Sequence, residues 1–216
     1  MKYKFKTKPY EHQLEALKRS WNKKEYAYFM EMGTGKSKVL IDNMALLYDK
    51  GGINAAIIIA PKGVYRNWSE NEIPTHMPDH IEKYMAVWTP APTKTQKHLL
   101  MKLFEVTDDL KILVVNVEAF STKKGVAFVE KFILAHNVLI AVDESTTIKN
   151  PKAQRTKNLL KLAVNTKYRR ILTGFPVTQS PLDLYSQSTF LSPHLLGYTS
   201  FYSFQNRYAK LINRTM

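Results

Sequence analysis

The stretch EMGTGKS at residues 31–37 lies between two apolar segments and decides the expected fold. Residues 26–30 before it have the pattern of a buried strand, and residues 38–47 after it have that of a helix. A strand, a glycine loop, a Lys-Ser pair and a helix in this order are typical of a phosphate-binding loop. The strict pattern of that loop is not met, because Met30 stands where its first glycine would be. The alternative is a glycine-rich turn in an unrelated α/β protein.

The residue types of this loop suit contact with phosphate. Glycines let the backbone turn tightly and direct N–H groups at phosphate oxygens, and the following helix adds partial positive charge at its N-terminus. Lys36 is expected to reach the terminal phosphates, and the Ser37 hydroxyl is expected to hold Mg²⁺. The predicted nucleotide contacts of the loop are Gly33, Thr34, Gly35, Lys36 and Ser37.

The composition is that of a globular protein with a large excess of positive charge. Of the 216 residues, 44% are hydrophobic and 23% are charged, which is ordinary. The formal net charge of +14 favours nucleic acid as a partner ahead of a membrane surface, the alternative being a merely soluble basic protein. The absence of cysteine excludes disulfides and thiolate metal sites. We expect the protein to be cytoplasmic, or nuclear in a eukaryote, and not to be secreted. The reason is that neither a signal sequence nor an apolar run near the ~20 residues of a membrane span is present.

Short apolar strands alternate with amphipathic helices along the chain. The expected strands span residues 26–30, 55–60, 84–88, 112–115, 138–142 and 170–172. The expected helices span residues 11–21, 38–47, 64–72, 95–104, 126–135, 151–163, 182–190 and 201–211, with Pro74 ending the third. Apolar strands separated by helices indicate an α/β domain with a mostly parallel sheet covered on both faces. Ligands of such sheets bind at the carboxyl ends of the strands.

Two adjacent carboxylates follow the apolar run at residues 139–142. Because side chains alternate along a strand, Asp143 and Glu144 are expected to point in different directions. Asp143 would hold Mg²⁺ through water, and Glu144 would orient or deprotonate an attacking water. The alternative is a solvated acidic turn before a helix. A phosphate-binding loop upstream in the same α/β chain favours the catalytic interpretation.

The motifs and their order resemble the first RecA-like lobe of a superfamily two helicase, of the Swi/Snf-like branch of DNA translocases. The segments that carry the resemblance are PYEHQ at 9–13, EMGTGKS at 31–37, IIIAPK at 57–62 with NW at 67–68, VVNVE at 114–118, VDE at 142–144 with IKNP at 148–151, and RILTGFP at 170–176 with PLDLY at 181–185. The resemblance implies a RecA-like P-loop domain that uses ATP and Mg²⁺, with Lys36 and Glu144 as catalytic residues.

The resemblance also implies roles outside the P-loop. Gln13 would read adenine, and Thr173 with Gly174 would couple hydrolysis to movement. Lys62 and Arg66 follow a strand at the position where this family contacts nucleic-acid phosphates, so the implied partner is the backbone of double-stranded DNA.

Three features depart from the family's pattern. Ser145 and Thr146 replace a small residue and a His or Gln, and Phe175 replaces a threonine, which affects the coupling of hydrolysis to residues 173–174. The family's second lobe, which supplies arginine fingers worth ~10³–10⁵ in rate, is not contained in residues 1–216. We therefore expect a truncated or naturally short form that is nearly inert as an ATPase.

The whole chain is expected to be a single ATPase lobe. A leading segment at 1–25 would carry the adenine-reading motif, residues 26–190 would form the P-loop core, and residues 191–216 would extend toward a second lobe. One alternative is a superfamily two helicase that unwinds RNA or branched DNA, against which the IKNP segment argues. The other is a non-catalytic nucleic-acid-binding or regulatory module.

Several conspicuous residues are expected to be structural. Trp68 is expected to pack in the interior, His76 to lie on the surface, and the basic run at 167–170 to be a solvated strand entrance. The alternating lysines from Lys2 to Lys8 predict an edge strand protected by charge, against the alternative of a basic-aromatic strip that binds nucleic acid.

Overall fold

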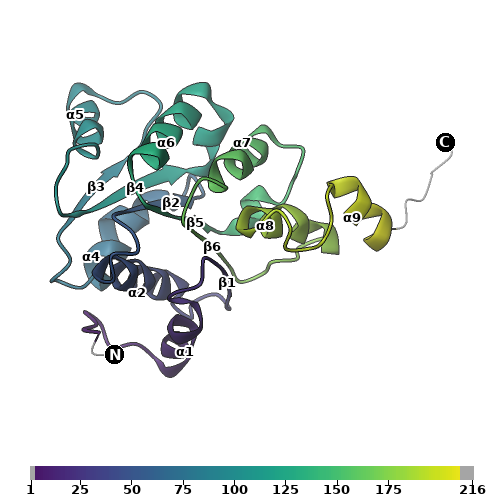
Figure 1. Cartoon of the computed structure of the whole chain (residues 1–216), viewed down its shortest axis with the longest axis horizontal. Helices are drawn as coiled ribbons and strands as arrows, with labels where there is room; N and C mark the ends of the chain where they lie inside the picture. Colours follow the sequence, from purple (N-terminus) through teal and green to yellow (C-terminus); the bar gives the residue numbers. More distant parts are fainter. Residues whose placement is uncertain (1–2, 210–216) are drawn as a thin grey trace.

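The computed structural model describes residues 3–209, which form a six-stranded, all-parallel sheet with helices on both faces (Figure 1). The strand order is β1-β6-β5-β2-β4-β3. The strands are β1 Glu25–Phe29, β2 Ala55–Ala60, β3 Lys83–Val87, β4 Leu110–Asn116, β5 Val138–Asp143 and β6 Tyr168–Thr173. The expected α/β class with a parallel sheet is confirmed.

The helices lie in two layers around this sheet, with α1, α2 and α4 on one face and α5, α6 and α7 on the other (Figure 1). The α-helices are α1 Glu11–Ser20, α2 Lys36–Asp49, α3 Tyr65–Asn67, α4 Ile73–His76, α5 Lys94–Lys102, α6 Lys123–Ala135, α7 Gln154–Ala163, α8 Leu184–Leu191 and α9 Phe201–Tyr208. Among the described residues, no helix is long and apolar enough to cross a membrane. The end of the helix expected at 201–211 lies outside the described residues.

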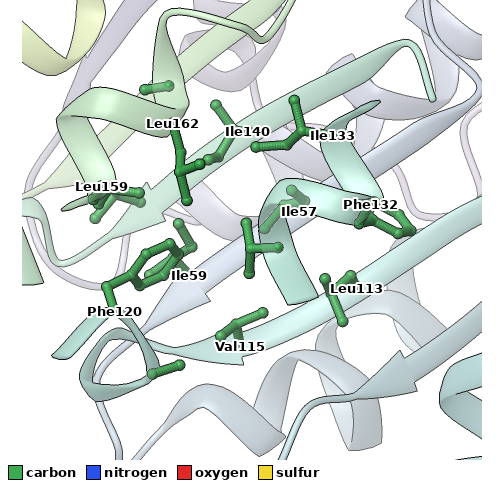
Figure 2. Close-up of a cluster of buried hydrophobic side chains, with 14 of the residues drawn as sticks. Ile57, Ile59, Leu113, Val115, Phe120, Phe132, Ile133, Ile140, Leu159 and Leu162 are labelled. Carbon is green, nitrogen blue, oxygen red and sulfur yellow. The ribbon is translucent and has the colours of Figure 1, made fainter. Parts of the chain in front are cut away.

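Each face of the sheet packs its own hydrophobic cluster. Ile57 and Ile59 of β2 face the cluster beneath α5, α6 and α7, where Phe120 and Phe132 also pack (Figure 2). Ile58, between them in the sequence, faces the other cluster against α2. Because successive side chains of a strand alternate, a central parallel strand must be apolar at every position, as β2 is.

The helical stretch after β2 does not end before Pro74, contrary to the prediction. A π-helical turn at Trp68–Glu72 follows α3, and α4 then runs over Ile73–His76. Pro74 lies in the first turn of α4, where a missing N–H leaves no intrahelical hydrogen bond unmade. The stretch from α3 to α4 therefore continues past the proline, and Glu72 and His76 of this stretch line a cavity at the carboxyl edge of the sheet.

The expected solvated strand entrance at 167–170 is also wrong, because Arg170 is fully buried. Its guanidinium donates hydrogen bonds to Oδ1 of Asn43 at 2.9 Å and to the carbonyl oxygens of Ser20, Lys23 and Lys24 at 2.8–3.1 Å. A buried charge needs such a set of partners. Arg170 thereby ties β6 to α2 and to the segment that leads into β1.

The lysine-rich start of the chain is not an edge strand over its described residues, and the edges of the sheet are β1 and β3. Tyr3 and Phe5 instead pack against the cluster around α2, and the Tyr3 hydroxyl donates to Asp42 at 3.3 Å. Lys6 pairs with Asp79 at 2.7 Å. The aromatic residues of this segment are thus used for packing, which the alternation of lysines did not indicate.

Candidate nucleotide-binding site

The loops that follow β1 and β5 meet at the carboxyl edge of the sheet, on either side of β6. They enclose a cavity of about 390 Å³. Its lining includes six predicted site residues: Gly33, Gly35, Lys36, Ser37, Asp143 and Glu144. The structure thus brings together the two motifs that the sequence separates by more than one hundred residues.

The P-loop, residues 31–37, has the backbone geometry expected of a phosphate cradle. Gly33 and Gly35 have φ values of +76° and +80°, and Gly35 is the N-cap of α2. A Cβ at Gly35 would overlap the side-chain amide of Gln13. The first N–H groups of α2 have no partners within the helix, and this end of the helix borders the cavity. Such a helix start favours an anion.

Lys36 lies across the loop that carries it. Its amine donates to the carbonyl oxygens of Met30 and Glu31, each at 3.1 Å, and its side chain is 9% exposed. Among the described residues, Lys36 forms no ion pair. A buried ammonium held only by neutral carbonyls is available to an anionic ligand in the same cavity.

Gln13 joins α1 to the P-loop. Its Nε2 donates to the carbonyl oxygen of Thr34 at 2.9 Å, and its Oε1 accepts from the N–H of Tyr10 at 3.0 Å. The Nε2 atom keeps one further hydrogen to donate, and the Oε1 atom keeps one further lone pair. Contact with adenine, the role expected for Gln13, therefore stays a prediction, and its contact with Thr34 is an additional one.

Asp143 is held at both of its carboxylate oxygens. Oδ2 accepts from the indole Nε1 of Trp68 at 2.9 Å, and Oδ1 accepts from the N–H of Glu144 at 3.0 Å. Burial raises the pKa of Asp143 to about 6, against the lowering effect of the Trp68 hydrogen bond. Trp68 is buried as expected. Its contact with Asp143 was not predicted, because packing in the interior was a sufficient reason for a tryptophan at this position.

Glu144 has a backbone conformation that non-glycine residues rarely adopt, with φ +47° and ψ +62°. No other described non-glycine residue has a positive φ. Such strain persists where surrounding structure enforces it, and it is concentrated at functional sites. Asp143 and Glu144 both line the cavity, and the separate roles expected of their side chains stay a prediction.

Thr173 is the last residue of β6, and Gly174 begins the loop after it, which lies against the P-loop. Thr173 is buried, and its hydroxyl oxygen accepts from the N–H of Phe175 at 3.2 Å. A Cβ at Gly174 would lie 3.3 Å from Cγ of Met32, so these two loops are in close contact. The role of Thr173 and Gly174 in coupling stays a prediction, and the contact between Gly174 and Met32 is consistent with it.

Ser145, which departs from the family's pattern, connects the β5 loop to the β6 loop. Its hydroxyl donates to Oε1 of Gln187 at 2.6 Å, and both side chains are fully buried. Nε2 of Gln187 in turn donates to the carbonyl oxygens of Pro176 at 2.7 Å and Asp183 at 2.8 Å. Ser145, at the position where the family has another small residue, therefore links the two segments through its hydroxyl.

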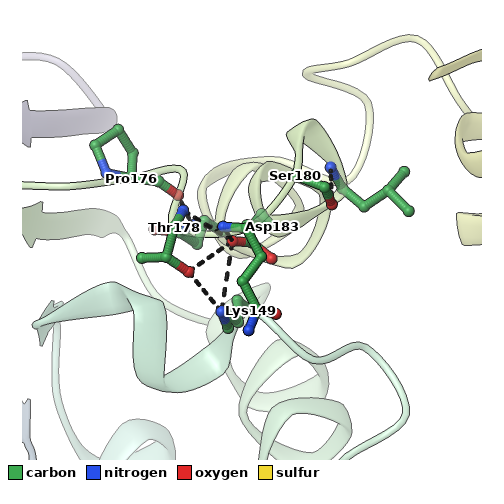
Figure 3. A network of polar contacts seen from close by, with 8 residues as sticks. Lys149, Pro176, Thr178, Ser180 and Asp183 are labelled. Atoms are coloured by element: carbon green, nitrogen blue, oxygen red, sulfur yellow. Dashed lines mark hydrogen bonds and ion pairs between the residues drawn. The ribbon is translucent and has the colours of Figure 1, made fainter. Parts of the chain in front are cut away.

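A second polar network links the same two segments (Figure 3). Oδ2 of Asp183 accepts from the N–H and hydroxyl of Thr178 at 2.9 and 2.8 Å, from the N–H of Gln179 at 2.9 Å, and from Lys149 at 3.5 Å. Burial alone would raise the pKa of Asp183, but these hydrogen bonds and the Lys149 charge lower it to about 2.

The predicted nucleic-acid contacts lie at the same edge of the sheet but outside this cavity. Lys62 and Arg66 follow β2 and are exposed. Arg66 lines a separate cavity of about 240 Å³, which also contains Thr89. His76, expected on the surface, is half-buried. Together with Glu72 it lines the cavity of the P-loop, Asp143 and Glu144, where neither residue was predicted.

The residues of the cavity fit a magnesium ion that arrives with phosphate. Among residues 3–209, no group of three or more histidines, cysteines or carboxylates could hold a metal by itself. Mg²⁺ commonly binds through one or two protein groups together with waters and substrate phosphates. Ser37 and Asp143 in one cavity are a donor set of this kind.

The chain is similar to ATPases of one family along most of its length. It is 30% identical over 168 residues to a probable ATP-dependent DNA helicase, CHR12, of Arabidopsis thaliana, covering 77% of this chain and 14% of that protein. It is also 30% identical over 168 residues to the chromatin-remodeling ATPase INO80 of Sclerotinia sclerotiorum, covering 76% of this chain and 9% of the relative.

A solved structure shares the fold. The SWI2/SNF2 ATPase core of Sulfolobus solfataricus, in complex with double-stranded DNA, matches 95% of this chain and 40% of its own, with a TM-score of 0.73 and 23% identity. The family model of the SNF2-related domain matches residues 12–215. The chain therefore belongs to the SNF2-related domain family.

Proposed function

We propose that this chain is the ATP- and DNA-binding motor lobe of an ATP-dependent DNA translocase. The observation that carries the proposal is the single cavity that joins the P-loop to Asp143 and Glu144. Phosphoryl transfer relies on positioning and on stabilisation of charge, and these residue types supply both.

The residues divide this work by chemistry. Lys36 and the start of α2 would bind the terminal phosphates, and Ser37 with Asp143 would hold Mg²⁺. When bound, Mg²⁺ neutralises charge on the phosphate oxygens. Glu144, in its strained turn at the cavity, would orient the attacking water.

DNA is the proposed nucleic-acid partner. The net charge of +14 and the exposed Lys62 and Arg66 support binding to a phosphate backbone. The relatives include a probable DNA helicase, and the similar solved core contains double-stranded DNA. We place the protein in the nucleus of a eukaryotic cell or in the cytoplasm of a prokaryotic one.

We further propose that residues 1–216 alone turn over ATP slowly. No described arginine lines the cavity. Arg170 is buried among its own partners, and Arg169 pairs with Glu25 at 2.6 Å, so neither is free to stabilise a transferring phosphate. Arginine fingers contribute ~10³–10⁵ in rate to such reactions.

Titration with a fluorescent ATP analogue tests the nucleotide site. Lys36→Ala should weaken binding at least tenfold, about 1.4 kcal/mol, because the phosphate loses its ammonium partner. Lys50→Ala, at the exposed end of α2, is the matched control and should bind as the parent does. Equal affinity of parent and Lys36→Ala would show that the loop is not a phosphate site. Phosphate release in the same samples should stay low with and without DNA.

The salt dependence of duplex binding tests the DNA surface. The logarithm of affinity should fall linearly with the logarithm of salt concentration, with a slope of about −0.9 per phosphate neutralised. Replacing Lys62 and Arg66 by alanine should flatten this slope by about one to two units. Lys50 and Lys161, exposed at the ends of α2 and α7, are the control pair. A flat salt response of the parent contradicts the proposal.

A further inference from the structure

Trp68 lies outside the predicted site but hydrogen-bonds to one of its carboxylates. Its indole Nε1 donates to Oδ2 of Asp143 at 2.9 Å, across 75 positions of sequence. The Glu144 N–H holds the other oxygen at 3.0 Å. With one donor on each oxygen, the plane of the Asp143 carboxylate is fixed, and each oxygen keeps a lone pair for another partner.

The backbone that presents Trp68 is unusual. Trp68 begins the π-helical turn at Trp68–Glu72, and such turns are frequent at functional sites. The same helical stretch supplies Glu72 and His76 to the lining of the cavity. Because the side chain of Trp68 is only 2% exposed, packing on every side limits the movement of its ring. A fixed ring gives its N–H a fixed direction.

We propose that Trp68 is a positioning residue for magnesium, acting through Asp143. This inference rests on the proposed function, in which Asp143 holds Mg²⁺ beside the nucleotide. Residues that hydrogen-bond a metal ligand orient it, and their loss commonly weakens metal binding by about 10–100-fold. Without the indole N–H, Oδ2 loses its protein donor, and only the Glu144 N–H then limits rotation of the carboxylate about its last torsion.

The competing explanation is that Trp68 only fills space beneath the site. Trp68→Phe separates the two, since phenylalanine keeps an aromatic ring in the cluster and lacks the N–H. Trp88→Phe is the matched control, because Trp88 is buried in the cluster on the other face of the sheet. Thermal melting of each variant shows whether it is folded.

The deciding measurement is the Kd of a fluorescent ATP analogue with Mg²⁺ and with EDTA. The ratio of the two values reports the coupling between metal and nucleotide. In Trp68→Phe this ratio should shrink by about tenfold, with the EDTA value within about twofold of the parent. In Trp88→Phe the ratio should match the parent.

Each outcome decides between separate hypotheses. A parent that binds no nucleotide, or binds it equally with and without Mg²⁺, contradicts the proposed function itself. A parent with normal coupling and a Trp68→Phe variant with the same ratio overturns the role of Trp68. Equal weakening of both values in Trp68→Phe also overturns it, because that pattern is the one expected of packing alone.

Intrinsic fluorescence provides a second test that leaves Trp68 in place. The chain has three tryptophans, so a variant with Trp21→Phe and Trp88→Phe emits from Trp68 alone. Its emission should change on adding the Mg²⁺ complex of ATP and not on adding ATP with EDTA, because metal binding alters the partner of the indole N–H. No change with the Mg²⁺ complex, under conditions where the analogue binds, would overturn the inference.

Discussion

The P-loop and the segment after β5, residues 144–149, border the same cavity but are held in different ways. Within the P-loop, the Thr34 hydroxyl donates to the carbonyl oxygen of Glu31 at 2.7 Å, and Lys36 donates to the carbonyl oxygens of Glu31 and of Met30 directly before the loop. The β5 segment is instead held by side chains from distant parts of the chain, through Gln187 and Asp183.

This difference shows two ways of building a rigid site. A loop held mainly by contacts among neighbouring residues depends on glycines, since only particular φ values allow those contacts to form. A segment held by distant side chains depends on tertiary packing. Its own residues therefore need no particular backbone conformation that would identify the segment in the sequence. The first kind should fail when its backbone is strained, and the second when a distant partner is removed.

The largest expected effect is on the P-loop backbone. Gly35→Ala should destabilise the fold by about 2–3 kcal/mol, because a left-handed φ of +80° costs an alanine about 1–2 kcal/mol and its Cβ would displace the Gln13 amide from its hydrogen bond to Thr34. Nucleotide affinity should fall at the same time. Urea unfolding and titration with the ATP analogue measure the two effects.

Gly51→Ala provides the matched control for this change. Gly51 has a similar φ of +66°, but nothing lies within 4 Å of its Cβ position. It should therefore show the strain alone, about 1–2 kcal/mol. If Gly35→Ala destabilises the fold no more than Gly51→Ala does, the contact with Gln13 does not constrain the P-loop.

The next effect concerns the polar network of the β6 loop. The pKa of Asp183, about 2, lies below the ordinary 3.8, so its ionised form stabilises the fold fully above about pH 4. This stability is lost as the pH falls through 2. Asp183→Asn should cost about 2 kcal/mol at pH 7, the value of nearly two pKa units, and progressively less toward pH 2.

Urea unfolding of parent and variant across this pH range checks the effect. Asp79→Asn is the control, because Asp79 also forms an ion pair but its side chain is 82% exposed. Surface pairs contribute about 0–1 kcal/mol. A penalty of Asp183→Asn that does not change with pH would show that ionisation of Asp183 is not the source of the stability.

The smallest effect is expected from the link between Ser145 and Gln187. Ser145→Ala should cost about 1 kcal/mol, since it leaves Oε1 of Gln187 buried without its donor. In a double-mutant cycle with Gln187→Leu, the coupling energy should be about 1 kcal/mol. Strictly additive effects in urea unfolding would show that these two residues do not act together.

The sequence predicted the order and kind of most elements correctly. The strand at 55–60 agrees with β2 at both ends, because a run of six buried apolar residues has no competing interpretation. The prediction at Pro74 was wrong, since a proline in the first turn of a new helix does not interrupt the stretch. The prediction at Arg170 was wrong because the burial of a charge depends on carbonyl groups that only the folded chain assembles.

The sequence by itself determined the form of the P-loop, because its glycine turns and the start of the helix after it depend on seven neighbouring residues. It also determined that Asp143 and Glu144 end a buried strand. Only the tertiary structure decided what holds Asp143 and Ser145, since their partners Trp68 and Gln187 are 75 and 42 positions away. A hydrogen bond between side chains so far apart leaves no periodic trace in the sequence, and it exists only once the parallel strands and the helix after β6 have brought the two partners together.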